Sequence, residues 1–194
     1  VINPYWTVPP SIARKEILPK IKKDPGYLAA RNFTLFSDWS DGARPVDPYS
    51  VDWSRVTPGN FGYKLRQGSG DGNALGRLKF MFPNPYNIYL HDTPARALFA
   101  KTERSFSHGC IRVQHPDELA AMVLSKQPDW DLERIRQTIK SDKRTIVSLA
   151  QPLPVHLAYL TAWVNKDGSV HFRNDVYGRD KILARALLGA EILY

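Results

Sequence analysis

The sequence predicts an α+β fold that is mainly β. Three observations predict it: short stretches rich in β-branched and aromatic residues, a few stretches with helical spacing of apolar residues, and Gly- or Pro-containing turns between them. At 194 residues the chain can form one domain with a sizeable core and an inserted subdomain. The predicted strands cover residues 2–8, 33–36, 62–67, 76–82, 87–91, 145–149, 155–164 and 170–173, the last two joined by a hairpin turn at 165–168.

The predicted helices each follow a recognisable start signal. Ser11 is expected to cap a helix over 12–18, and a short helical stretch is expected over 27–31. Pro116 starts a helix, Asp131 caps the next one, and the last helix runs over 180–189 with Gly189 ending it. The residues expected to face the core are Leu119, Met122 and Val123 in the first of these three helices and Leu132, Ile135 and Ile139 in the second.

A long segment without a regular pattern covers residues 37–60. It is polar, rich in turn residues, and contains Trp39 and Trp53. Such a stretch inside a compact domain is usually functional, or is a surface loop anchored by its aromatic side chains. The Gly-rich loop at 68–72 is not expected to bind phosphate, because no Lys-Ser/Thr follows it and the next element is a predicted strand.

Composition limits the classes of partner. The formal net charge of +8 favours anionic partners, but no nucleic-acid-binding module is present, so nucleic acid is not an expected partner. No apolar run approaches the roughly 20 residues that a membrane span needs. The chain begins with Val and opens directly on a predicted strand, so we expect it to be part of a longer protein.

Residues 105–113 carry the strongest chemical signal, because they contain the only cysteine of the chain. A thiolate is the reactive form of cysteine, and a nearby imidazole can accept the thiol proton. His108 is two residues from Cys110, and His91 would have to be brought close by the fold. Gly109 permits a sharp backbone turn and close approach of a substrate to peptide N–H groups, which are the usual donors of an oxyanion hole.

Two other interpretations of these residues stay open on chemistry alone. A single Cys is often a small buried hydrophobic residue. His91, His108 and Cys110 are also zinc-ligand types, although a His-x-Cys spacing without a Cys pair is unusual for zinc. Residue chemistry alone places a catalytic thiol modestly ahead of a buried one, and no metal site is predicted.

Residues 107–112, Ser-His-Gly-Cys-Ile-Arg, with His91 upstream, resemble the signature of the L,D-transpeptidases, the YkuD-type catalytic domain. The resemblance extends over nearly the whole chain. It is closest to the large periplasmic members of Gram-negative bacteria, and the further stretches that carry it are residues 3–9, 73–76, 79–84, 89–94 and 175–178.

The resemblance implies a β-sandwich-like catalytic domain with peripheral helices and an inserted, α-containing capping subdomain. We expect residues 1–10 and 61–194 to form the catalytic domain and residues 11–60 the capping subdomain, with an N-terminal part of the parent protein absent from the chain. It also implies a periplasmic location. No cofactor is implied.

The activity implied is transfer between peptidoglycan stem peptides. Stem peptides would be donor and acceptor, an outer-membrane lipoprotein an alternative acceptor, and carbapenem β-lactams covalent inhibitors. Hydrolysis of the same bond (an L,D-carboxypeptidase) and a catalytically silent wall-binding module are the alternatives. The implied catalytic residues are Cys110 as nucleophile, His91 as base, His108 and Gly109. The implied substrate-contacting or orienting residues are Arg112, Ser107, Tyr89, Asp92 and Trp6. A purely structural role is the alternative for Arg112, and core packing is the alternative for Tyr89 and Trp6.

Overall fold

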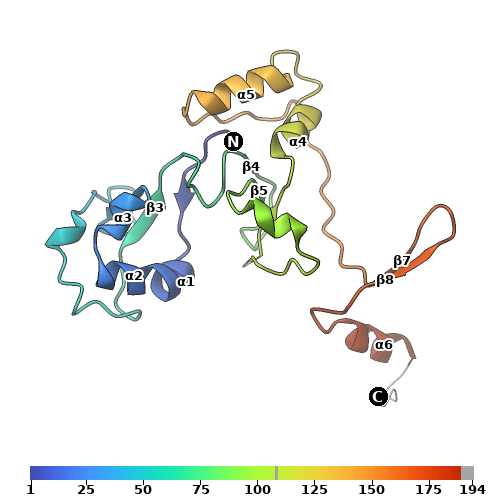
Figure 1. Cartoon of the computed structure of the whole chain (residues 1–194), viewed down its shortest axis with the longest axis horizontal. Helices are drawn as coiled ribbons and strands as arrows, with labels where there is room; N and C mark the ends of the chain where they lie inside the picture. Colours follow the sequence, from blue (N-terminus) through green and yellow to red (C-terminus); the bar gives the residue numbers. More distant parts are fainter. Residues whose placement is uncertain (108, 189–194) are drawn as a thin grey trace. The chain divides into compact units, whose positions relative to one another are not determined.

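The computed structural model describes residues 1–107 and 109–188. These residues form two compact units, Val1–Leu153 and a second unit that begins at Pro154 (Figure 1). The larger unit has two hydrophobic cores of its own, one in its N-terminal part and one formed mainly by residues after 75.

The N-terminal part of the larger unit is a three-stranded antiparallel sheet with helices beside it (Figure 1). The sheet order is β1-β3-β2. Its core combines buried residues of the helices with Val8, Leu35 and Leu65 of the strand regions. The elements are β1 (Trp6–Thr7), α1 (Pro10–Ile12), the π-helix η1 (Ala13–Ile17), α2 (Leu18–Lys23), α3 (Tyr27–Ala30), β2 (Phe33–Phe36), the 3₁₀-helix η2 (Pro48–Ser50) and β3 (Lys64–Gln67).

The first helix differs from the sequence-based expectation. It begins at Pro10 rather than Ile12, and Ser11 lies inside it instead of capping it. The N-cap is Pro9, without a side-chain cap. Proline suits the first helical position because it has no N–H group that needs a partner, so the cap was unnecessary. The predicted strands at 33–36 and 62–67 are confirmed as β2 and β3, the latter two residues shorter.

The second part of the larger unit contains the mixed sheet β4-β5-β6. β5 pairs with β4 antiparallel and with β6 parallel. Helices α4 and α5 cover a small core with Ile2, Leu78, Ala120, Leu124 and Ile135. The elements are β4 (Lys79–Phe80), β5 (Leu90–His91), the 3₁₀-helix η3 (Arg96–Ala100), β6 (Ile111–Arg112), α4 (Pro116–Val123) and α5 (Leu132–Lys140).

Helix starts in this part are confirmed, but strand lengths are not. Pro116 begins α4, and the Asp131 carboxylate accepts a hydrogen bond from Arg134 N at 2.7 Å. The predicted strands at 76–82 and 87–91 shrink to two residues each, with prolines 83 and 85 between them unable to donate ladder hydrogen bonds. Of 145–149, only Thr145 pairs, with Ile2. Met122 is 65% exposed, so its expected core position is wrong.

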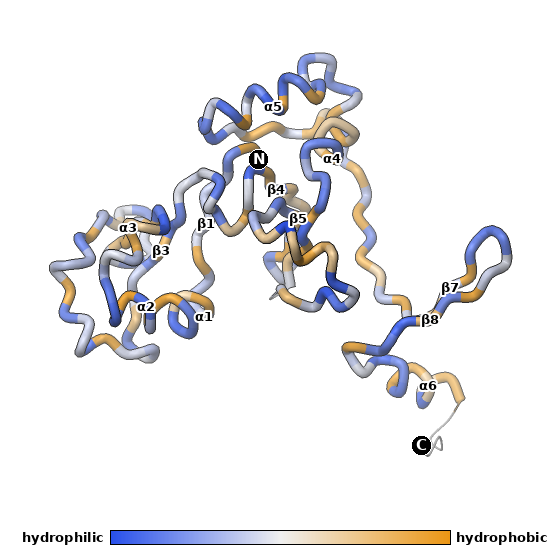
Figure 2. The backbone as a smooth tube through the Cα atoms, viewed as in Figure 1, coloured by the Kyte–Doolittle hydropathy of each residue, from blue (hydrophilic) through white to orange (hydrophobic). Residues whose placement is uncertain are grey.

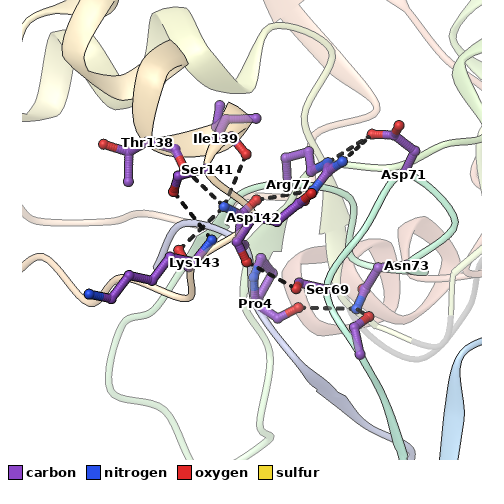
Figure 3. A network of polar contacts seen from close by, with 12 residues as sticks. Pro4, Ser69, Asp71, Asn73, Arg77, Thr138, Ile139, Ser141, Asp142 and Lys143 are labelled. Carbon is purple, nitrogen blue, oxygen red and sulfur yellow. Dashed lines mark hydrogen bonds and ion pairs between the residues drawn. The ribbon is translucent and has the colours of Figure 1, made fainter.

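A polar network, buried at Asn3 and Asn73, joins three distant segments of the larger unit (Figure 3). Asn3 is fully buried and donates from Nδ2 to the carbonyls of residues 138, 139 and 143, where α5 ends. Arg77 pairs with Asp71 and Asp142. Asn73 Nδ2 donates to the Pro4 carbonyl at 3.1 Å. The network thereby fixes residues 3 and 4 between the loop that precedes β4 and the end of α5.

The second unit is a two-stranded hairpin followed by a helix. β7 (Ala162–Val164) pairs antiparallel with β8 (Val170–Phe172), which confirms the predicted hairpin, although β7 is shorter than the predicted strand over 155–164. α6 (Asp180–Leu188) follows, and the predicted stop at Gly189 lies outside the described residues. Hydrophobic and hydrophilic residues are interspersed along α6 (Figure 2). None of the described residues of this unit is buried.

The observed class is thus a mixture of helices and small sheets. Among the described residues, no helix is long and apolar enough to cross a membrane. The sandwich-like arrangement and the capping role of residues 11–60 remain predictions.

Candidate active site

Parallel pairing of β5 with β6 brings the segment of His91 beside the segment of Cys110. The register aligns Leu90 with Ile111 and His91 with Arg112. Side chains alternate between the two faces of a strand, so Tyr89 and His91 share one face with Cys110 and Arg112. Two backbone hydrogen bonds fix this register, from Ile111 N to the Tyr89 carbonyl at 3.0 Å and from Val113 N to the His91 carbonyl at 2.8 Å.

The Cys110 thiol is partly exposed, and Cys110 directly precedes β6. Its Sγ is 3.9 Å from the carbonyl oxygen of Asn87. Gly109 has a φ of +130°, a left-handed conformation that favours glycine. Its N–H donates to Ser107 Oγ at 3.2 Å. His108, a predicted site residue, lies outside the described residues.

His91 is 5% exposed, and its Nδ1 is hydrogen-bonded to the backbone carbonyl of Asp92. That bond leaves Nε2 as the nitrogen available for proton exchange. Burial lowers the pKa of His91, the Asp92 carbonyl opposes this, and the nearby Arg112 guanidinium lowers the pKa further. Burial therefore favours the neutral imidazole, which is the form that accepts a proton.

The Asp92 carboxylate supports the segment that orients His91. It is buried, and its Oδ2 accepts a hydrogen bond from Arg77 N at 2.8 Å. Oδ1 has no hydrogen bond of good geometry but lies 3.0 Å from Arg96 Nη2, as an ion pair. Gly76, at φ +60°, makes room for this carboxylate, since a Cβ there would lie 2.3 Å from Asp92 Oδ2. Asp92 is thus a buried structural support beside the candidate base.

Tyr89 and Lys79 form the immediate surroundings of the thiol. Burial raises the pKa of Tyr89, and the Cys110 thiol adds to this effect, so the phenol stays protonated as a donor. Lys79 Nζ lies 3.8 Å from the centroid of the Tyr89 ring. The β4–β5 register places Lys79 opposite His91, so Lys79, His91 and Arg112 form one row across the sheet. Burial lowers the pKa of Lys79.

A cleft of about 1210 Å³ contains these groups. It brings together Cys110, His91, Arg112, Ser107, Tyr89 and Trp6 of the predicted site. Asp92 does not line the cleft. Gly109 directly precedes Cys110 in sequence but does not line the cleft either. Arg112 Nε is buried and has no hydrogen-bond partner within the described ranges.

Several residues that line this cleft were not predicted from the sequence. Lys79 was noted only as part of the resemblance, and Tyr5, Arg66 and Arg144 were assigned no role, yet all four line it. The only available signal was the alternation of side chains along strands. That signal identifies which residues share a face, but the facing cations come from segments whose pairing the sequence does not reveal.

The zinc interpretation finds no support in the described part of the chain, where no group of three or more His, Cys, Asp and Glu residues is placed to hold a metal ion. His108, one of the three candidate ligands, is outside that part.

Comparison with known proteins identifies the class. Residues 1–147 match the family model of the YkuD L,D-transpeptidase catalytic domain, and the chain belongs to this family. A protein of Haemophilus influenzae named "Putative L,D-transpeptidase" is 38% identical over 181 residues, which are 93% of this chain. The match covers 36% of that relative, so the chain spans about a third of its length.

Proposed function

We propose that the chain forms 3→3 cross-links between the stem peptides of peptidoglycan through a thioester on Cys110. The thiolate attacks the carbonyl carbon of the third stem residue, a diaminopimelate whose L-centre is linked to a terminal D-Ala. The C–N bond breaks, and D-Ala leaves with the proton that His91 took from the thiol. The side-chain amine of a second stem then attacks the thioester, a new C–N bond forms, and the amine proton returns to sulfur through His91. The thioester retains the free energy of the cleaved amide.

One observation carries this proposal: the β5–β6 register sets a neutral, oriented imidazole and a partly exposed thiol on the same face of a cleft. A general base must be neutral, and its free nitrogen must face the group that it deprotonates. Bonding of His91 Nδ1 to the Asp92 carbonyl meets the requirement for orientation, and burial favours the neutral form.

The negative charge that develops on the oxygen of the attacked carbonyl must be stabilised by hydrogen-bond donors. We assign this role to the backbone N–H groups of His108, Gly109 and Cys110. The N–H of Gly109 now donates to Ser107 Oγ, and a substrate oxyanion would replace that hydroxyl. Loss of one such donor typically costs about 10²–10³ in rate. His108 would also tune the thiolate.

Arg112, Ser107, Tyr89 and Trp6 receive binding or orienting roles. Arg112 has a buried Nε without a partner in the described segments, which suits a carboxylate of the stem. Ser107 would orient the loop before Cys110, and Tyr89 and Trp6 would line the groove for the peptide. The proposed setting is the periplasm, with an outer-membrane lipoprotein as a further acceptor and carbapenems as covalent inhibitors.

The test is incubation of the protein with purified disaccharide-tetrapeptide, followed by mass spectrometry, with Cys110→Ala as the matched control. We expect a cross-linked dimer that has lost one D-Ala, absent in the control. Tripeptide without dimer would instead establish the hydrolytic alternative. No product, together with no covalent carbapenem adduct on Cys110, would refute the enzymatic proposal and leave a wall-binding module as the better description.

A further inference from the structure

Several positively charged side chains line the cleft in addition to the groups at the candidate thiol. Lys79 lies beside Tyr89, and the charge of Arg144 is close enough to contribute to lowering the pKa of Lys79. Arg144 and Arg66 then share the ring of Tyr5, their guanidinium carbons lying 5.6 and 5.1 Å from its centroid. All of these side chains line the cleft.

The two arginines at Tyr5 come from different parts of the larger unit. Arg66 is on β3, in the sheet with its own helical core, whereas Arg144 directly precedes Thr145, which pairs with Ile2. Both guanidinium groups are exposed. Across the described residues, no ion pair involves either of them.

Two like charges over one ring repel each other. Each cation–π contact at an exposed site stabilises by only about 0.5–1 kcal/mol, which does not neutralise the charge. Of the described residues that line the cleft, only Glu16 is acidic, against Arg66, Lys79, Arg112 and Arg144. With both guanidinium carbons within 5.6 Å of the Tyr5 centroid, an anion bound to both groups would offset this repulsion. Planar guanidinium groups fit carboxylates through paired hydrogen bonds.

The geometry points to a carboxylate subsite between Arg66 and Arg144 at Tyr5, separate from the thiol and from Arg112. Resting on the proposed function, the ligand is a free carboxylate of a stem peptide, bound by a cation from each part of the unit. The same chemistry is present on the donor stem and on the acceptor stem, and the experiment distinguishes them.

The experiment measures binding first, without catalysis. Disaccharide-tetrapeptide is titrated into the Cys110→Ala protein by calorimetry, alone and combined with Arg66→Gln or Arg144→Gln, and the titration is repeated with the tetrapeptide amidated at its carboxylates. The matched control is Lys64→Gln, because Lys64 shares β3 with Arg66 and lies over the same Phe36 ring but does not line the cleft. Thermal melting of each variant checks folding, and Arg66→Lys and Arg144→Lys retain the charge.

We expect each Gln variant to weaken binding of the free acid roughly tenfold, the size of one charge-assisted hydrogen bond. The amidated peptide should bind weakly to all proteins alike, and Lys64→Gln should match its parent. Equal weakening of acid and amide, unchanged binding of the acid, or no binding of tetrapeptide to the Cys110→Ala protein would each overturn the subsite. Normal binding with no product from the protein that retains Cys110 would refute the proposed function alone.

Rate measurements on the protein that retains Cys110 then separate the two sources. If the donor carboxylate occupies the subsite, the Gln variants slow formation of the thioester. If the acceptor carboxylate occupies it, thioester formation stays normal and only its transfer to a second stem slows. A subsite variant that changes neither step would overturn the assignment to this reaction.

Discussion

The rate of Cys110 acylation should fall at acidic pH as His91 becomes protonated. Replacing Lys79 by Met should shift this fall, the acid limb of the pH–rate profile, to higher pH. The ammonium of Lys79 is 3.8 Å from the centroid of the Tyr89 ring, which is 5.8 Å from that of His91. The two charges are therefore at most roughly 10 Å apart, where an effective dielectric constant of about 40 gives a repulsion of about 0.8 kcal/mol. At 1.36 kcal/mol per unit, loss of this charge raises the pKa of His91 by about 0.6.

The sign follows from which form of His91 is active. Burial and the neighbouring cations lower the pKa of His91, so removing one cation raises it and protonates more of the base at a given acidic pH. The assay is the rate of carbapenem adduct formation on Cys110 between pH 4.5 and 8, followed by intact mass. Below the midpoint the variant should react roughly fourfold more slowly, as a shift of about 0.6 units requires.

Lys64→Met is the matched control, since Lys64 Nζ lies over the ring of Phe36 at 5.2 Å, outside the cleft lining. Its acid limb should coincide with that of the unsubstituted protein. An unshifted limb in Lys79→Met, a shift to lower pH, or an equal shift in both variants would refute the reasoning about His91.

Three further predictions concern residues that support the structure of the larger unit. Gly76→Ala should reduce acylation at least tenfold and lower the melting temperature, because its Cβ would meet the Asp92 carboxylate at 2.3 Å and φ is +60°; a variant with normal rate and melting temperature would contradict the role given to Asp92. Ile135→Ala, which removes a fully buried side chain, should cost about 2–4 kcal/mol in urea unfolding, and a loss under 1 kcal/mol would argue against the α4–α5 core. Asp131→Ala should cost about 1 kcal/mol by removing the cap on Arg134 N, with Asp131→Asn largely neutral; equal losses in both would point away from capping.

Local signals predicted the elements that local chemistry determines. Pro116 and Asp131 marked two helix starts correctly, and residues 165–168 marked a hairpin, because cap and turn preferences act within a few residues. Strand lengths were overestimated, since a β-rich stretch becomes a strand only where a partner supplies hydrogen bonds. Met122 had the spacing of a core residue, but no element among the described residues covers it.

The candidate site likewise has a part that was predictable from the sequence and a part that was not. The family signature identified Cys110 and His91, whose proximity depends on the parallel register of β5 with β6. The cations opposite them were not predictable. Lys79 lies opposite His91 through strand pairing, and Arg66 and Arg144, 78 residues apart in sequence, both lie over the Tyr5 ring. No short-range pattern encodes these contacts.

The Asn3 network affects the order in which parts of the protein can fold. The Nδ2 group of Asn3 bonds to carbonyls 135, 136 and 140 residues later in the chain. Synthesis proceeds from the N-terminus, so the Nδ2 group of Asn3 lacks these partners until α5 has left the ribosome. Tyr5 and Trp6, which follow directly and line the cleft, gain this anchor only then. We therefore expect the cleft to form late in folding, because contacts of such long sequence separation form more slowly than the local contacts of the helices around it.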